Sequence, residues 1–218
     1  MKTLTKEMQA TITPFKALEL LKEGNKRFIN NLKINRNLLQ QVNETSAGQY
    51  PFAVVLSCID SRTSAELIFD QGLGDVFSIR IAGNILNEDI LGSMEFGCKV
   101  AGSKIIVVLG HTKCGAVKGA CDHVEMGNLT GLLGKIRPAV DDEKTIHTNR
   151  SSSNEEFVEK VTIINIRRTA EAILERSRIL KEMNDSGQIA IVGALYNVSS
   201  GEVIFYPEIL NNSSLKNA

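Results

Sequence analysis

The hydrophobic residues in the first half of the chain gather in short runs, each too short for a helix. The runs at 52–56, 76–81 and 105–109 are rich in Val, Ile and Leu, as is typical of strands buried on both faces. The segments at 63–69 and 88–100 lie between these runs and are long enough for helices. This alternation predicts right-handed crossovers and a parallel sheet.

Helical periodicity occurs on both sides of these strands. Thr13 and Pro14 form an N-cap and first-turn pair, and the apolar residues that follow predict an amphipathic helix over about 14–31. Such a helix packs its apolar side either on its own sheet or on a partner subunit, and the pattern does not choose between them. A second amphipathic stretch lies at 129–140, and the polar, aperiodic residues at 141–153 predict a surface loop.

The last third of the chain predicts one long helix and a hairpin. Ser153 and Glu156 have the spacing of a capping box, and apolar positions continue on one side until a stop at Gly187. The runs at 189–196 and 203–206 are typical of a hairpin at a sheet edge. We therefore predict an α/β fold: a mostly parallel β-sheet flanked by helices, with an antiparallel edge hairpin and an N-terminal helical arm.

The composition is that of an ordinary globular protein. Hydrophobic residues make up 43% of the 218 residues and no long linker divides the chain, so we expect a single domain over 1–218, with a helical arm at 1–48 and an α/β core at 49–218. The 25 basic and 25 acidic residues balance, which argues against a nucleic-acid partner. No apolar run approaches the roughly 18 residues of a membrane span, and charge replaces the apolar stretch of a secretory signal. We expect a cytoplasmic protein without a membrane partner.

Side chains that bind metals follow two of the predicted strands. Cys58, Asp60 and Arg62 follow the first strand, and His111 and Cys114 follow the third. Because the carboxyl ends of parallel strands line one crevice, these two segments can converge. Two thiolates and an imidazole suit zinc, and three protein ligands leave the fourth position open, as in a catalytic site. Alternation returns Asp60 to the side of Cys58, where it ligates the metal or hydrogen-bonds its water, with Arg62 as a bidentate partner.

Two other interpretations of these residues compete with a catalytic site. The stronger is a structural zinc site in which Asp60 is a permanent fourth ligand, and the weaker is a set of ordinary buried cysteines. Cys98 and Cys121 are expected to pack in the core. His123 and His147 lie in polar surroundings, where a solvated surface role is expected.

The two strand-end segments also resemble a known family. Cys58-Ile-Asp60-Ser-Arg62 and His111-Thr-Lys-Cys114-Gly are similar to the two zinc-site signatures of the β-class carbonic anhydrases. The likeness extends over about 49–119 and is to the plant-type subgroup. The resemblance implies Zn2+ held by the two cysteines and the histidine, with the aspartate and arginine as a catalytic dyad.

The plant-type resemblance also assigns residues around the substrate. It implies that Gln49 hydrogen-bonds the substrate from across a dimer interface. Phe77 matches the pocket phenylalanine, Phe96 stands in place of a tyrosine, and Gly83 lies in a glycine-asparagine turn assigned to the same pocket. Val55 replaces the tryptophan of the bicarbonate-inhibited subgroup, so that allosteric site is expected to be missing.

The resemblance implies a zinc lyase that reversibly hydrates carbon dioxide to bicarbonate and a proton by attack of zinc-bound hydroxide. It further implies a homodimer, or a dimer of dimers, joined through the N-terminal helices. The alternatives are a hydrolase of carbon disulfide or carbonyl sulfide on the same fold, and a non-catalytic structural zinc module. If Arg62 releases Asp60 to the metal as pH falls, the site has a closed state and activity begins only above a threshold pH.

Overall fold

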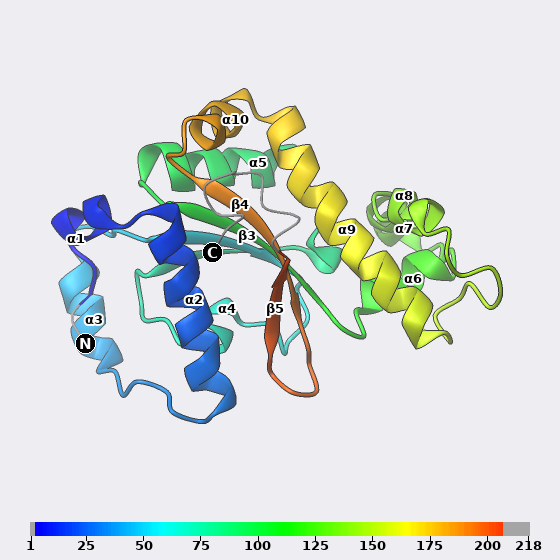
Figure 1. Cartoon of the computed structure of the whole chain (residues 1–218), viewed down its shortest axis with the longest axis horizontal. Helices are drawn as coiled ribbons and strands as arrows, with labels where there is room; N and C mark the ends of the chain where they lie inside the picture. The colour runs from blue at the N-terminus through cyan, green and yellow to red at the C-terminus, as the bar shows by residue number, and fades with distance from the viewer. Residues whose placement is uncertain (1–2, 207–218) are drawn as a thin grey trace.

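One five-stranded sheet forms the centre of the protein. A computed structural model describes residues 3–206, so residues 1–2 and 207–218 of the predicted domain lie outside the described part (Figure 1). The strands are β1 (Ala53–Ser57), β2 (Val76–Arg80), β3 (Ile105–His111), β4 (Ala190–Tyr196) and β5 (Val203–Tyr206). Their order is β2-β1-β3-β4-β5, parallel except for the antiparallel pair β4 and β5. The predicted α/β fold and its edge hairpin are confirmed.

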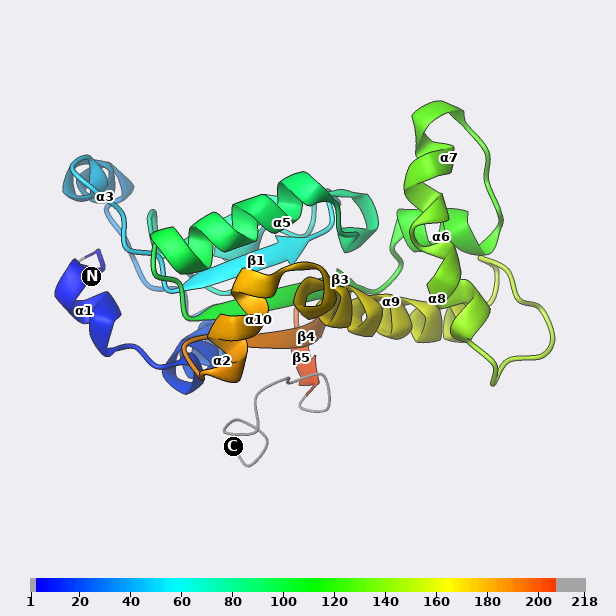
Figure 2. The same cartoon turned by 90° about the horizontal axis from the view of Figure 1, so that it is seen from above.

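Helices flank the sheet and extend beyond its ends. They are α1 (Lys6–Thr11), α2 (Pro14–Ile29), α3 (Leu38–Thr45), α4 (Ala65–Ile68), α5 (Glu88–Glu95), α6 (Gly115–Cys121), α7 (Gly127–Gly134), α8 (Arg137–Asp142), α9 (Glu155–Arg176) and α10 (Arg178–Asp185), with a 3-10 turn η1 (Ala82–Asn84) and a π-helical turn η2 (Phe96–Val100). Figure 2 shows α1 and α3 at one end of the molecule and α6, α7 and α8 at the other. Within residues 3–206 no helix is long and apolar enough to cross a membrane.

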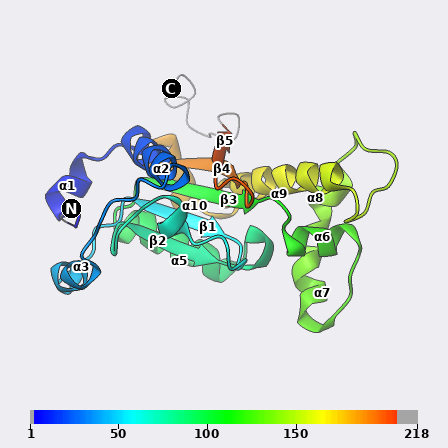
Figure 3. The same ribbon diagram turned by 90° about the horizontal axis from the view of Figure 1, so that it is seen from below.

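The central strands are buried because alternate side chains enter two hydrophobic layers. In β1, Val55 packs in the layer that contains α2 and α4, whereas Val54 packs in the layer that contains α5, α9 and α10. Figure 3 shows α2 and α5 on opposite sides of the strands. The helix predicted at 14–31 therefore packs on this chain's own sheet, through residues that include Leu18 and Leu21.

The single long helix predicted from Ser153 to Gly187 is wrong, because the structure has two helices there. Ser177 separates α9 from α10 with extended backbone angles, φ −117° and ψ 105°. Its hydroxyl accepts the Leu180 N–H at 3.1 Å and donates to Glu95 Oε1 at 2.6 Å. The break thus starts a new helix and fixes it against α5, a long-range contact that periodicity does not contain.

Other helix boundaries also differ from the predicted ones. Asn154, rather than Ser153, caps α9 by accepting the Phe157 N–H. The stretch at 129–140 divides into α7 and α8, and the segment at 88–100 ends in the π-helical η2. Helices α1 and α3 were not predicted, because each is short and mostly polar.

A buried carboxylate ties the amino-terminal part of the chain to the segment after α4. Asp70 accepts hydrogen bonds from Arg27 Nε and Arg36 Nη1, each at 2.5 Å, and its side chain is only 2% exposed. Burial raises the pKa of Asp70, but these hydrogen bonds outweigh it and the pKa is lowered overall. The segment that leads to α3 is therefore held against the body of the protein.

Candidate metal centre

Three metal-binding side chains meet at the carboxyl ends of β1 and β3. Cys58 directly follows β1, His111 is the last residue of β3, and Cys114 is the N-cap residue of α6. Their ligand atoms all lie within 4.8 Å of one another and all three residues are buried. This convergence follows from topology, because β1 and β3 are parallel neighbours whose ends lie at one edge.

The histidine in this group presents an open nitrogen. His111 Nδ1 lies 3.0 Å from the Thr112 carbonyl oxygen, which can only accept, so Nδ1 carries the hydrogen. His111 Nε2 is then left with its lone pair, and within residues 3–206 this buried atom has no hydrogen-bond partner. A buried acceptor without a partner is costly unless something binds it. With two sulfur atoms 4.0 Å apart beside it, the donor set fits zinc.

The surroundings favour ionisation of Cys58. Its pKa is lowered to about 4, first because Cys114 Sγ donates a hydrogen bond to it. Backbone N–H groups, including that of Gly83 at 3.4 Å, act in the same direction, and together these hydrogen bonds outweigh burial. The pKa of Cys114 is raised, because its proton is held by the neighbouring sulfur and because it is buried. These contacts therefore favour the thiolate form of Cys58.

The predicted dyad has a bidentate geometry. Arg62 Nε donates to Asp60 Oδ1 at 2.9 Å and Arg62 Nη2 donates to Asp60 Oδ2 at 2.8 Å. The Arg62 backbone N–H adds a third bond to Oδ1 at 3.0 Å. These contacts hold the pKa of Asp60 far below its usual range. Asp60 Oδ2 lies 4.0 Å from His111 Nε2, so the carboxylate faces the metal donors.

Two side chains that sequence reasoning did not assign hold the main chain of this segment. Arg80, at the end of β2, donates to the carbonyl oxygens of Cys58 and Asp60 at 3.0 Å and 2.6 Å. The Thr63 hydroxyl lies 3.0 Å and 2.8 Å from the same two oxygens and forms hydrogen bonds with them. The signal for Arg80 was its place at the carboxyl end of a strand next to β1, where the other site residues also lie.

Three residues predicted to surround the substrate, Gln49, Phe77 and Phe96, do not flank the metal donors within one chain. Gln49 is exposed and precedes β1, so the length of that strand, roughly 15 Å, separates it from Cys58. Phe77 pairs with Val54, three positions or roughly 10 Å before the strand ends. Its ring lies 6.2 Å from that of Phe96, and the two form an edge-to-face pair.

Gly83, which is predicted to line the substrate pocket, lies beside the metal donors. Its backbone N–H donates to the sulfur of Cys58 at 3.4 Å. Cys98 and Cys121 pack in hydrophobic clusters, where burial raises their pKa values to about 12 and about 11. The two other histidines, at 123 and 147, are exposed.

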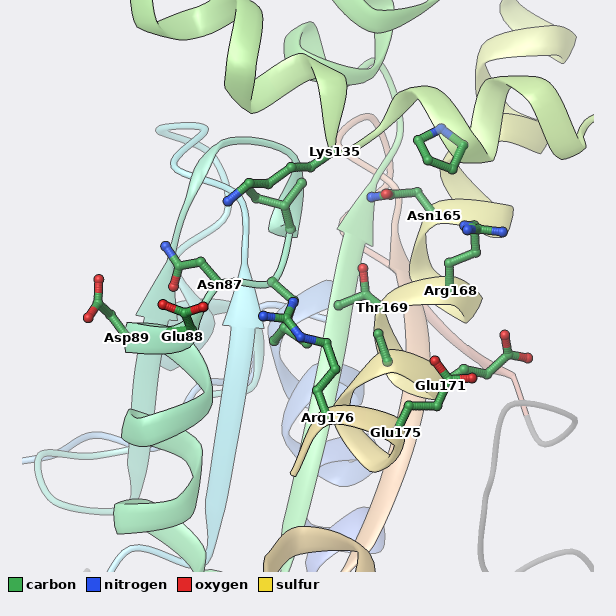
Figure 4. Close-up of a pocket in the computed structure, with 14 residues that line it drawn as sticks. Asn87, Glu88, Asp89, Lys135, Asn165, Arg168, Thr169, Glu171, Glu175 and Arg176 are labelled. Atoms are coloured by element: carbon green, nitrogen blue, oxygen red, sulfur yellow. The ribbon is translucent and has the colours of Figure 1, made fainter. Parts of the chain in front are cut away.

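A separate cavity of about 550 Å³ lies between α5, α8 and α9 (Figure 4). It is lined by charged side chains of both signs, including Lys135, Arg176 and Glu88. None of the three metal donors lines it. Its inner wall includes Asn165 and Thr169 of α9, which lie close to the turn that carries Gly83.

An open, mostly parallel sheet with a buried Cys-His-Cys group at its carboxyl edge defines an α/β protein with a zinc site. The sequence profile described as carbonic anhydrase matches residues 53–203, and the chain belongs to this family. It is 36% identical over 205 residues to carbonic anhydrase 2 of Mycobacterium tuberculosis, covering 91% of this chain and 95% of that protein. It is 34% identical over 193 residues to the carbonic anhydrase of Mycolicibacterium smegmatis, with coverages of 87% and 92%.

Solved structures of the β class share the fold. The β-carbonic anhydrase CcaA superimposes with a TM-score of 0.67 at 26% identity, covering 87% of this chain and 94% of that one. The Coccomyxa β-carbonic anhydrase in complex with acetazolamide gives 0.68 at 22% identity, with coverages of 86% and 85%. The β class and its zinc cofactor are thereby established. Membership of the plant-type subgroup stays a prediction.

Proposed function

We propose that this protein catalyses the zinc-dependent reversible hydration of carbon dioxide to bicarbonate at the centre formed by Cys58, His111 and Cys114. The observation that carries the proposal is the buried, unpartnered Nε2 of His111 beside two sulfur atoms and an arginine-held carboxylate. Zinc, when bound there, supplies a nucleophile at neutral pH by lowering the pKa of water. Bicarbonate and carbon dioxide are the small-molecule partners of this reaction.

The pair of Asp60 and Arg62 would orient an O–H group beside the metal donors by accepting a hydrogen bond from it. Asp60 is ionised, because Arg62 donates to both of its oxygens, so it can only accept hydrogen bonds at neutral pH. A carboxylate facing the metal donors fixes the orientation of an O–H group beside it, which aligns the reacting atoms. The same contacts support an open fourth metal position, since Arg62 competes with the metal for the carboxylate.

A second copy of the chain would complete the substrate pocket. Gln49, Phe77 and Phe96 lie away from their own metal donors, and Phe96 is 52% exposed. The β2 edge of the sheet has no neighbouring strand within residues 3–206. Exposed apolar side chains lie on α3 and the segment before it: Leu32, Leu38, Leu39 and Val42. We therefore assign a homodimer, in which the amide of Gln49 and the apolar ring of Phe77 act in the partner's site. A cytoplasmic location is part of the same proposal.

The test is stopped-flow hydration of carbon dioxide at pH about 8.5, on the alkaline side of the pKa of about 7 that zinc confers on water. Zinc content is measured in the same sample, and Asp60→Asn is compared with Asp185→Asn, which alters an exposed carboxylate paired with Lys181. We expect the Asp60→Asn rate to fall about 100-fold or more with zinc retained. Stoichiometric zinc without hydration in the unaltered protein would contradict the proposal and favour a structural site or another linear substrate.

A further inference from the structure

The turn behind the metal donors is held by helix α9. Gly83, in η1, donates its backbone N–H to Cys58 Sγ at 3.4 Å. Its φ is +68°, and a Cβ atom there would lie 2.5 Å from Ile136 Cδ1 and 3.2 Å from Ala116 Cβ. Glycine is the residue that allows this conformation, but glycine also leaves the backbone free to rotate. Within the turn, the Asn84 N–H donates to the Ile81 carbonyl oxygen at 3.0 Å, and side chains from outside the turn add to this support.

Two polar side chains of α9 supply this outside support. Asn165 Nδ2 donates to the Gly83 carbonyl oxygen at 2.9 Å, and the Thr169 hydroxyl lies 3.5 Å from the Asn84 carbonyl oxygen. The two residues are four apart, so they lie on the same side of the helix. They are only 3% and 6% exposed. Figure 4 shows both on the side of α9 that faces the strands, whereas Arg168 points away.

We propose that Asn165 is a positioning residue for the metal centre, which acts by holding the carbonyl of Gly83 so that its N–H group points at the sulfur of Cys58. Thr169 is the second support of the same turn. This inference rests on the proposed function, because it takes Cys58 to be a metal ligand. It assigns a role to a residue that touches neither metal nor substrate.

Loss of the asparagine amide would release the turn. The Gly83 carbonyl would become a buried acceptor without its donor, which costs free energy until it finds another partner. The cavity lined by Asn165 would admit water as such a partner, and the positive φ of Gly83 leaves its backbone free to move toward it. The carbonyl and N–H of Gly83 belong to adjacent peptide groups joined at its Cα, so a shift of the turn would move the N–H relative to Cys58 and weaken its hydrogen bond to the thiolate. Removal of such outer contacts typically weakens metal binding about 10- to 100-fold.

The experiment compares Asn165→Ala with Asn165→Asp, which keeps the shape of the side chain but removes its amide donor. Thr162→Val is the matched control, because Thr162 is also buried on α9 yet, among residues 3–206, its hydroxyl bonds only the Val158 carbonyl of its own helix. Zinc affinity is measured by competition with a chelator. The sulfur-to-metal charge-transfer band of the cobalt-substituted protein reports the thiolate directly, and circular dichroism reports folding.

We expect both Asn165 variants to bind zinc about 10- to 100-fold more weakly with a shifted cobalt band, and Thr162→Val to match the unaltered protein. Unchanged affinity and an unchanged band in a folded Asn165 variant would overturn the inference. If Asn165→Ala fails to fold, Asn165→Asp decides the matter. A protein that binds zinc normally but does not hydrate carbon dioxide overturns the proposed function alone, and one that binds no zinc overturns both.

Discussion

At the residue scale, Gly83 shows how little freedom remains around the metal donors. Its positive φ and its crowded Cα leave room for hydrogen alone, and its two backbone polar groups contact Cys58 and Asn165. A substitution there affects backbone strain, packing and the thiolate at once. Gly187, which follows α10, has a similar φ of +74°, but apart from Gly187 and its two chain neighbours no described residue has an atom within 4 Å of the place where its Cβ would be. A comparison of Gly83 with Gly187 therefore separates the energetic cost of backbone strain from the cost of a packing overlap.

We expect Gly187→Ala to lower the free energy of unfolding by about 1–2 kcal/mol, the cost of left-handed backbone for a residue with Cβ. Gly83→Ala should lose about 1–3 kcal/mol more, because its methyl group overlaps Ile136. Urea unfolding at saturating zinc measures both. Equal losses in the two variants would show that the Ile136 contact relaxes freely.

At the element scale, an ion pair between a buried carboxylate and a partly exposed arginine holds the predicted surface loop at 141–153. Glu143 accepts hydrogen bonds from the Thr145 and Ile146 backbone N–H groups and from Arg150 Nη1. Arg150 also lies 4.6 Å from the ring centroid of the buried Phe157 in α9. The loop is therefore polar in sequence but anchored at one carboxylate, which links the end of α8 to α9.

This carboxylate predicts a pH dependence of stability. Burial raises the pKa of Glu143, but hydrogen bonds from Thr145 and Ile146 and the charge of Arg150 outweigh it and lower the pKa from 4.5 to about 2. Because the folded pKa is the lower one, the stabilisation is complete above the unfolded pKa near 4.5 and is lost as pH falls toward 2.

We expect Glu143→Gln to be less stable than the unaltered protein at pH 7, with the difference shrinking between pH 4.5 and 2. Glu156→Gln, which alters an exposed glutamate on α9, is the control. The free energy of unfolding is measured by urea titration at several pH values. A constant difference across this range would mean that the Glu143 charge does not stabilise the folded state.

At the scale of the whole molecule, the predicted site residues lie at the two ends of one strand. Cys58, Asp60 and Arg62 follow β1, with His111 and Cys114 beside them at the end of β3, whereas Gln49 lies before β1. If Gln49 acts in the partner's site, two defective chains can complement each other. A dimer of a Gln49→Ala chain and an Asp60→Asn chain has one site in which both residues are intact.

Co-expression of these two variants with different tags should recover about one quarter of the full activity, since half of the dimers are mixed and each has one intact site. Co-expression of an Asp60→Asn chain with an Arg62→Ala chain is the control. This mixture should recover no activity, because Asp60 and Arg62 pair within one chain. Recovery no greater than the parent variants in the first mixture would exclude a role for Gln49 across the interface.

The sequence by itself determined the fold class and the metal donors of this protein. Buried strands are recognisable in the sequence as continuous runs of Val and Ile. The carboxyl ends of parallel strands lie at one edge of the sheet, whatever the sequence that connects the strands. Cys58, His111 and Cys114 were therefore predictable as a group, and so was the pairing of Asp60 with Arg62, which is local.

The tertiary structure alone decided the remaining features. Ser177 breaks a continuous helical pattern because Glu95, which is distant in sequence, accepts a hydrogen bond from its hydroxyl group. Asn165 contacts the turn at Gly83 because α9 packs beside that turn, and Arg80 contacts the carbonyl oxygen of Cys58 because β2 lies next to β1. The separation of Gln49 from the metal donors depends on strand direction. Such facts follow from contacts between distant parts of the chain, which residue patterns along one segment do not encode.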